Sequence, residues 1–180
     1  MCGGKSKRMG TDKGLIPIGN TCWAAYMADK LVAIPMPVVI SVNTSQIETY
    51  QAFFSIEQLV VDSLNIGGPL NGLLGVHLKY PDDDLLLVAC DMVNMKAKTL
   101  DRLISTYLVE TGYDCYVYQN IDFAEPFCGI YKASVLSDLM NRSEVVTLSN
   151  MSLQKLLNDR NTLRLSITEW ESFQNYNTLT

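Results

Sequence analysis

Residues suited to phosphate chemistry stand at four places along the 180-residue chain. The first is a glycine-rich basic stretch near the amino terminus, with Gly3, Gly4, Arg8 and Lys13. The other three places follow short apolar runs and hold Ser41 and Asn43, then Asp62, and then Asp91. Glycine lets backbone N–H groups approach phosphates closely because no Cβ intrudes. Magnesium prefers oxygen ligands and often uses one or two carboxylates together with substrate phosphates. This combination predicts a site for a nucleotide, its phosphates and a metal ion.

Each of these features also has a structural explanation. The glycine-rich stretch could be a solvated terminus, and Asp91 could cap the turn that follows it. Gly4-Lys5-Ser6 matches the end of the P-loop motif, but the motif's first glycine would fall before Met1, and two more glycines stand where its helix should run. Taken together, the features fall in order at successive strand ends, which favours a functional interpretation.

The elements that must position these residues follow from the hydrophobic pattern. Apolar runs alternate with segments of helical period, which predicts repeated βα units around a mostly parallel sheet. We expect strands at 37–41, 59–61, 85–90, 115–118, 127–131 and 163–167, and helices at 70–79 (opened by Pro69), 97–110, 134–140 and 152–158. The run 85–90 is apolar on both faces and is therefore placed in the middle of the sheet. Ligands of such sheets bind outside the carboxyl ends of the strands, where Ser41, Asp62 and Asp91 stand.

The predicted fold is thus α/β: one Rossmann-like, three-layer domain over 1–180, with a mostly parallel central sheet flanked by helices. Glycine-rich phosphate loops follow a buried first strand in such folds, yet here the loop begins almost at Met1. We expect this strand to lie upstream of Met1, or else to be reduced to a stub.

Composition excludes several other classes of function. A net charge of −5 argues against a nucleic-acid partner, because that affinity comes mainly from clustered Lys and Arg. The five cysteines are scattered, which predicts neither a disulfide framework nor a zinc site. No apolar run approaches the roughly 20 residues of a membrane span, and no secretory signal is evident, so we expect a cytoplasmic protein. A monomer is also expected, although no sequence pattern indicates the oligomeric state. His77, the only histidine, is expected to be a partly exposed helical residue without a catalytic role.

The segment Cys2-Gly3-Gly4-Lys5-Ser6-Lys7-Arg8-Met9-Gly10-Thr11-Asp12-Lys13 resembles the signature loop x-G-G-x-S-x-R-M-G-x-D-K of the molybdenum cofactor guanylyltransferases. Further segments agree with that family in the same order: 39–43, 61–63, 68–73, 90–92, 125–131, 152–157 and 173–178. The resemblance covers essentially the whole chain. The paired glycines at Gly3 and Gly4 look like the guanylyl enzymes rather than the related cytidylyl enzymes.

This resemblance implies a fold of the nucleotide-diphospho-sugar transferase type and a reaction. GMP would pass from GTP to the phosphate of molybdopterin, with Mg²⁺ as cofactor and pyrophosphate as the leaving group. It implies catalytic roles for Lys13, Asp91 and Arg8, with Asp91 as metal ligand. It implies binding roles for Met1, Cys2, Gly3, Gly4, Lys13, Ser41, Asn43, Asp62, Gly68, Gly72, Asp91, Asn175 and Asn177, of which Asn175 and Asn177 resemble the segment that helps hold molybdopterin.

Molybdenum insertion proteins and recipient molybdoenzymes are the protein partners that the resemblance implies. Two alternatives stay open. One is another small nucleotidyltransferase of the same fold that uses CTP or a sugar phosphate, and the other is a non-catalytic nucleotide-binding domain.

Overall fold

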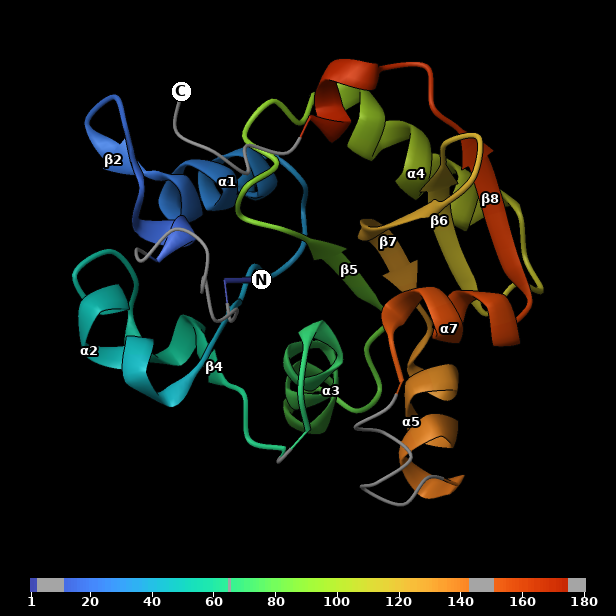
Figure 1. The fold of residues 1–180 in the computed structure, drawn as a ribbon, viewed down its shortest axis with the longest axis horizontal. Coiled ribbons are helices and arrows are strands. Elements are labelled where there is room, and N and C mark those ends of the chain that lie inside the picture. The colour runs from blue at the N-terminus through green and yellow to red at the C-terminus, as the bar shows by residue number, and fades with distance from the viewer. Residues whose placement is uncertain (3–11, 65, 143–150, 175–180) are drawn as a thin grey trace.

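A four-stranded sheet forms one half of the protein, for which a computed structural model describes residues 1–2, 12–64, 66–142 and 151–174 (Figure 1). Its strands are β5 (Leu85–Val88), β7 (Ala124–Tyr131), β6 (Cys115–Gln119) and β8 (Thr162–Ser166), in that spatial order. β7 runs antiparallel to both β5 and β6, whereas β6 and β8 are parallel. The α/β class is confirmed, and the sheet is mixed.

The expectation of a mostly parallel sheet was wrong for the four-stranded sheet, and the short connection between β6 and β7 explains why. The Asn120 side chain accepts hydrogen bonds from the backbone N–H groups of Asp122 and Phe123, at 3.1 and 2.9 Å. These bonds close a tight turn, and a turn this short can join only antiparallel strands.

A second, two-stranded sheet pairs β3 (Ile40–Val42) with β4 (Leu59–Val61) in parallel. Met1 and Cys2 lie between this pair and β5. The Met1 amino group donates to the Val88 carbonyl at 2.8 Å, and the Met1 carbonyl accepts from Cys90 N at 3.2 Å. Cys2 N donates to the Ser41 carbonyl at 2.9 Å. These two residues therefore hydrogen-bond to both sheets through the backbone.

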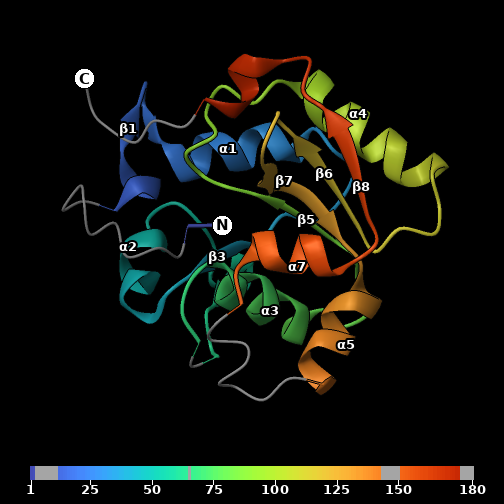
Figure 2. The same ribbon diagram turned by 45° about the vertical axis from the view of Figure 1, so that its right-hand side comes forward.

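Helices cover both faces of the four-stranded sheet (Figure 2). On one face α3 (Pro69–Lys79), α5 (Ala133–Arg142) and α7 (Leu153–Asp159) form a core with Cys115 and Val117. On the other face α1 (Trp23–Val32) and α4 (Ala97–Val109) pack with Tyr116 and Tyr118. Alternate residues of β6 point to opposite faces, so this one strand contributes to both cores, and the three-layer arrangement follows.

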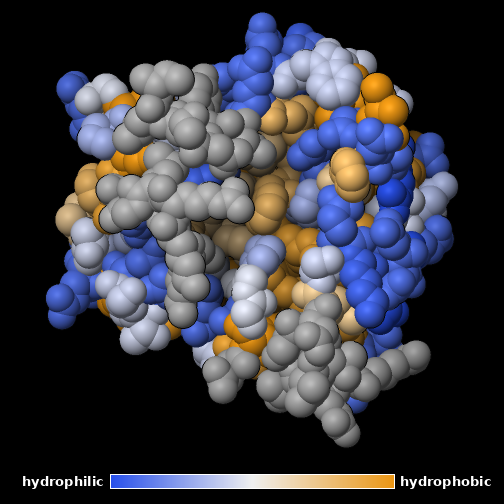
Figure 3. All heavy atoms as spheres, viewed as in Figure 1, coloured by the Kyte–Doolittle hydropathy of each residue, from blue (hydrophilic) through white to orange (hydrophobic). Residues whose placement is uncertain are grey.

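The remaining elements are short. They are the β1–β2 hairpin (Pro17–Ile18 and Thr21–Cys22), the helix α2 (Ile47–Tyr50) and the 3₁₀ turns Lys13–Leu15, Thr44–Gln46, Ile56–Gln58 and Trp170–Phe173. In the view of Figure 3, hydrophobic residues are visible in a recessed central area, and hydrophilic residues lie along its right-hand side. None of the helices in the described ranges has the length and apolar character that crossing a bilayer requires.

Candidate active site

The carboxyl ends of β3 and β4 bring Ser41 and Asp62 together. These strands pair in parallel with Ser41 opposite Val60, so their ends reach the same edge of the sheet. The Ser41 hydroxyl donates to Asp62 Oδ1 at 2.9 Å. Burial raises the pKa of Asp62, while this hydrogen bond and the nearby amino terminus oppose the rise. The pair offers carboxylate oxygens in a largely enclosed place.

Gly72 of α3 packs directly against this pair. A Cβ at Gly72 would lie 2.4 Å from Ser41 Oγ, 3.0 Å from Met1 Cε and 3.2 Å from Asp62 Oδ1. Any side chain there would displace the Ser41 hydroxyl. The structure therefore gathers four of the predicted binding residues, Met1, Ser41, Asp62 and Gly72, in one place.

Lys13 and Asp91 form the charged part of the site. Lys13 Nζ lies 3.1 Å from Asp91 Oδ2, and the two side chains are 26% and 18% exposed. Asp91 follows β5 by three residues, and Lys13 begins a 3₁₀ turn. Both side chains are partly exposed to solvent, so a bound ligand could replace one of them as the partner of the other.

Asp12 fixes the turn that carries Lys13. Its Oδ1 accepts from Gly14 N and from the Tyr50 hydroxyl, both at 3.0 Å. Its Oδ2 accepts from Gln46 Nε2 at 2.5 Å, and the same amide nitrogen lies 3.2 Å from the Cys2 carbonyl. The turn Thr44–Gln46 and the helix α2 that follows it thereby hold the lysine turn close to Cys2, although both lie more than 30 residues away in the sequence.

Cys2 connects the two parts of the site, because its backbone bonds to Ser41 and its thiol contacts that of Cys90, next to Asp91. The hydrogen bond from Cys90, together with the nearby amino terminus, lowers the pKa of the Cys2 thiol to about 7, although burial opposes this. All five cysteines are buried and free.

Two predicted binding residues have structural roles that are visible here. Asn43 Oδ1 accepts from Ser45 N at 3.0 Å, and Gln46 Oε1 accepts from Asn43 N at 2.8 Å, which is a capping box at the turn Thr44–Gln46. Gly68 precedes α3 with a φ of 78°, a conformation that favours glycine. Their binding roles stay predictions.

Sequence reasoning missed Gln46, Tyr50 and Cys90. The spacing of Asn43 and Gln46 signalled a capping box, but no local pattern pointed to their contacts with Asp12 and Cys2. His77 lies in a helix, α3, as predicted, but the expected partial exposure was wrong: the residue is buried, with 3% exposure, and Nε2 lies 3.0 Å from Ser137 Oγ. Five predicted residues lie outside the described residues: Gly3, Gly4, Arg8, Asn175 and Asn177.

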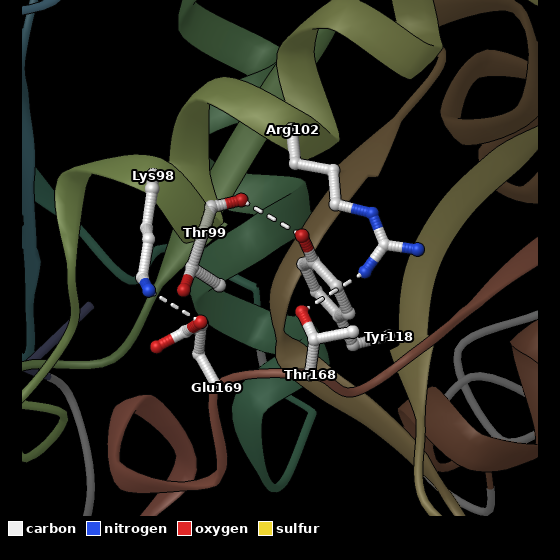
Figure 4. Close-up of a pocket in the computed structure, with 6 residues that line it drawn as sticks. All are labelled: Lys98, Thr99, Arg102, Tyr118, Thr168 and Glu169. Atoms are coloured by element: carbon white, nitrogen blue, oxygen red, sulfur yellow. Dashed lines mark hydrogen bonds and ion pairs between the residues drawn. The ribbon is translucent and has the colours of Figure 1, made fainter.

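A separate small cavity of about 230 Å³ lies between α4 and the ends of β6 and β8 (Figure 4). Its cations are already engaged, since Lys98 pairs with Glu169 at 2.5 Å and Arg102 donates to the Ser166 carbonyl at 2.9 Å. None of the predicted site residues is among those that line this cavity.

Comparison with known proteins supports the same interpretation. Residues 1–162 match the MobA-like NTP transferase domain. The chain belongs to this family. It is therefore a nucleotidyltransferase, and the resemblance to the molybdenum cofactor guanylyltransferases is confirmed.

Two curated relatives show how much of the chain is shared. A molybdenum cofactor biosynthesis bifunctional protein of Synechocystis is 31% identical over 133 residues, which are 73% of this chain and 37% of that protein. A probable molybdenum cofactor guanylyltransferase of Flavobacterium johnsoniae is 26% identical over 153 residues, 85% of this chain and 77% of that protein. The chain thus spans little more than a third of the bifunctional relative.

Solved structures confirm the fold. Molybdopterin-guanine dinucleotide biosynthesis protein A from Archaeoglobus fulgidus matches with a TM-score of 0.80 and 19% identity, covering 98% of this chain and 90% of that one. A cytidylyltransferase from Leptospira borgpetersenii matches with a TM-score of 0.67 and 16% identity, covering 89% and 73%. At these identities the likeness concerns the fold alone.

Proposed function

We propose that this protein transfers GMP from GTP to the phosphate of molybdopterin and releases pyrophosphate. The observation that carries the proposal is the Lys13–Asp91 pair, 3.1 Å apart, which Cys2 connects to the Ser41–Asp62 pair through Ser41 O and the Cys90 thiol. Ligands of open α/β sheets bind outside the carboxyl ends of the strands. The names of the relatives from Flavobacterium johnsoniae and Archaeoglobus fulgidus supply the guanylyl group and the acceptor.

The charges of the two pairs suggest how the nucleotide lies. Lys13 can neutralise phosphate oxygens, whereas the Asp62 carboxylate would repel them. We therefore assign the Lys13–Asp91 region to the triphosphate and the Ser41–Asp62 region to the nucleoside. Carboxylate oxygens at Asp62 can accept hydrogen bonds from nucleoside N–H or O–H groups.

Asp91 is the residue that fits Mg²⁺. It is a half-buried carboxylate, and Lys13 Nζ lies 3.1 Å from its Oδ2. The described residues contain no group of three or more His, Cys, Asp or Glu side chains placed to hold a metal, which accords with an ion that keeps several waters and substrate phosphates as ligands. When bound, Mg²⁺ would neutralise charge on the triphosphate.

The chemistry of the step demands little more of the protein. An oxygen of the molybdopterin phosphate attacks the α-phosphorus of GTP, the bond to the bridging oxygen breaks, and pyrophosphate leaves. A phosphate monoester with a second pKa of about 6 is already anionic at neutral pH, so no general base is needed. Lys13 would leave Asp91 for the leaving pyrophosphate, because a flexible ammonium can follow the developing charge.

A nucleotide-specificity assay tests the proposal. Pyrophosphate release is measured with molybdopterin as acceptor and with GTP, CTP or ATP as donor, each with Mg²⁺. We expect release with GTP that depends on molybdopterin. Release with CTP instead would favour a cytidylyl enzyme of the same fold, and no release with any nucleotide that binds would favour a non-catalytic domain.

A further inference from the structure

The loop 89–96 contains Asp91, leads from β5 to α4 and runs beside α1 (Figures 1 and 2). It is built from turns, one of which is closed by Met95 N donating to Met92 O at 2.8 Å. Met92, Val93 and Met95 are buried in the core that α1 and α4 share. Turns adopt their shape from such anchors rather than from a ladder of repeated hydrogen bonds. The position of the Asp91 carboxylate therefore depends on what holds this loop.

One face of α1 packs on the loop and ends in a charge. Trp23, Met27 and Lys30 stand at positions i, i+4 and i+7, which lie on one side of a helix. Trp23 and Met27 are buried in the same core as the loop. Lys30 continues this face, and its Nζ donates to Val93 O at 2.6 Å and to Met95 O at 3.1 Å. The helix thus offers the loop two apolar side chains and one ammonium group.

The ammonium group holds two carbonyl groups that would otherwise repel each other. Val93 O and Met95 O are two residues apart, and both point to the same nitrogen atom. Hydrogen bonds from a charged donor are stronger than those between neutral groups. The Tyr26 ring lies 4.7 Å from Lys30 Nζ and favours the cation at this place. Without the charge, the two carbonyl dipoles would turn apart toward water, and the turns of the loop would open.

The same helix also holds the turn that carries Lys13. Trp23 N donates to Ile16 O at 3.0 Å, and Ile16 N donates to Lys13 O at 3.2 Å. Lys30 follows Trp23 by two helical turns, or roughly 10 Å at 1.5 Å per residue. One rigid helix is therefore bonded at its beginning to the turn of Lys13 and near its end to the loop of Asp91.

We propose that Lys30 is a positioning residue for the metal site: its ammonium group fixes the loop 89–96 and thereby the place at which the Asp91 carboxylate meets a magnesium ion. This inference rests on the proposed function, in which Asp91 holds the metal. Lys30 acts through the loop backbone, as residues around metal ligands commonly do by fixing the orientation of the ligand.

Three variants test the proposal. Lys30→Met removes the charge and keeps an unbranched apolar side chain, whereas Lys30→Arg keeps a cation that can donate to both carbonyls. Lys79→Met is the matched control, because Lys79 Nζ likewise donates to a backbone carbonyl, that of Glu57 at 3.1 Å, and lies 5.5 Å from the Tyr80 ring. Lys79 is at the end of α3 and does not belong to the face that packs on the loop.

The first measurement is the Mg²⁺ concentration that gives half-maximal GTP binding, by calorimetry. We expect it to rise about tenfold in Lys30→Met, the lower end of what loss of such a residue costs in metal affinity. Lys30→Arg and Lys79→Met should match the parent. Loss of a positive charge near the site would by itself strengthen binding of Mg²⁺, so weaker binding in Lys30→Met reports the position of Asp91 and not the charge of Lys30.

The second measurement is amide exchange in the absence of nucleotide. Met95 N, which closes the turn, should exchange at least about tenfold faster in Lys30→Met than in the parent, because the charge-assisted bonds to the loop are lost. Ala89 N donates to Phe127 O of β7 at 3.1 Å and should exchange at the rate of the parent. Equal acceleration at both amides would mean a general loss of stability and would overturn the positioning role.

Two further outcomes separate this proposal from the proposed function. An unchanged Mg²⁺ requirement in Lys30→Met, with a raised one in Asp91→Asn, would overturn the role of Lys30 and leave the proposed function standing. A raised Mg²⁺ requirement and faster Met95 exchange in Lys30→Met, with no molybdopterin-dependent release of pyrophosphate by the parent, would support the role of Lys30 and count against the proposed transfer reaction.

Discussion

Gly72→Ala is the substitution whose effect the geometry defines most sharply. The new Cβ would lie 2.4 Å from Ser41 Oγ, far inside van der Waals contact. Ser41 can relieve this clash only by turning its hydroxyl away from Asp62, because its side chain has one rotatable bond and a 2.9 Å hydrogen bond depends on its direction. The substitution should therefore break the Ser41–Asp62 pair.

Gly75→Ala is the matched control, since both glycines lie in α3 and both are buried. A Cβ at Gly75 would meet its nearest atom, Val61 O, at 3.5 Å, an ordinary contact. Replacing Gly by Ala inside a helix stabilises by about 0.5–1 kcal/mol, while overpacking costs about 1–3 kcal/mol. We expect the free energy of unfolding to rise by about 0.5–1 kcal/mol in Gly75→Ala. In Gly72→Ala it should either stay unchanged or fall by up to about 2 kcal/mol.

Urea denaturation of both variants measures this difference, and calorimetry with GTP measures its effect on the site. Gly72→Ala should weaken GTP binding, because Asp62 loses the hydrogen bond that orients it, whereas Gly75→Ala should bind as the parent does. Equal stabilisation of the two variants, with unchanged GTP affinity in Gly72→Ala, would refute the packing argument.

Three further outcomes are expected. Lys13→Ala should lower the rate of pyrophosphate release about 10²–10³-fold, and an unchanged single-turnover rate would exclude a role for Lys13 in the transition state. The raised pKa of Asp62 means that its contribution to stability is present below the unfolded pKa of about 3.9 and is lost as pH rises through the folded value. Urea unfolding between pH 4 and 7 should therefore show that the free energy of unfolding of Asp62→Asn rises relative to that of the parent as pH rises. A difference in free energy that does not change with pH would contradict this. Cys90→Ala should raise the pKa of Cys2 above about 7, seen as a shifted pH profile of Cys2 alkylation by mass spectrometry; an unmoved profile would show that Cys90 does not set it.

The sequence alone predicted the site residues that stand at or after the ends of apolar runs. Ser41, Asp62 and Asp91 each follow an apolar run, and the parallel pairing of β3 with β4 brings two of them within hydrogen-bond distance. Strand 59–61 and the helix opened by Pro69 were also predicted correctly, because a β-branched run and a proline at the first helical position are local signals.

Contacts between distant segments could not be predicted in this way. The strand expected at 37–41 is Ile40–Val42 in the structure, since its extent depends on pairing with β4 and Cys2. The direction of β7 depends on the turn at Asn120, which the apolar pattern does not record. The network that joins Asp12 to Gln46 and Tyr50 spans more than 30 residues, and no local spacing indicates it.

The central claim is that Asp91 holds the metal of a nucleotide whose phosphates lie against Lys13. Calorimetric titration of GTP with Mg²⁺, and again with EDTA, tests it most directly in the parent, in Asp91→Asn and in the control Asp83→Asn, which changes the charge equally at an exposed position. The account predicts that Asp91→Asn binds Mg²⁺-GTP at least about tenfold more weakly, while Asp83→Asn matches the parent. Equal affinity of all three proteins for Mg²⁺-GTP would contradict it.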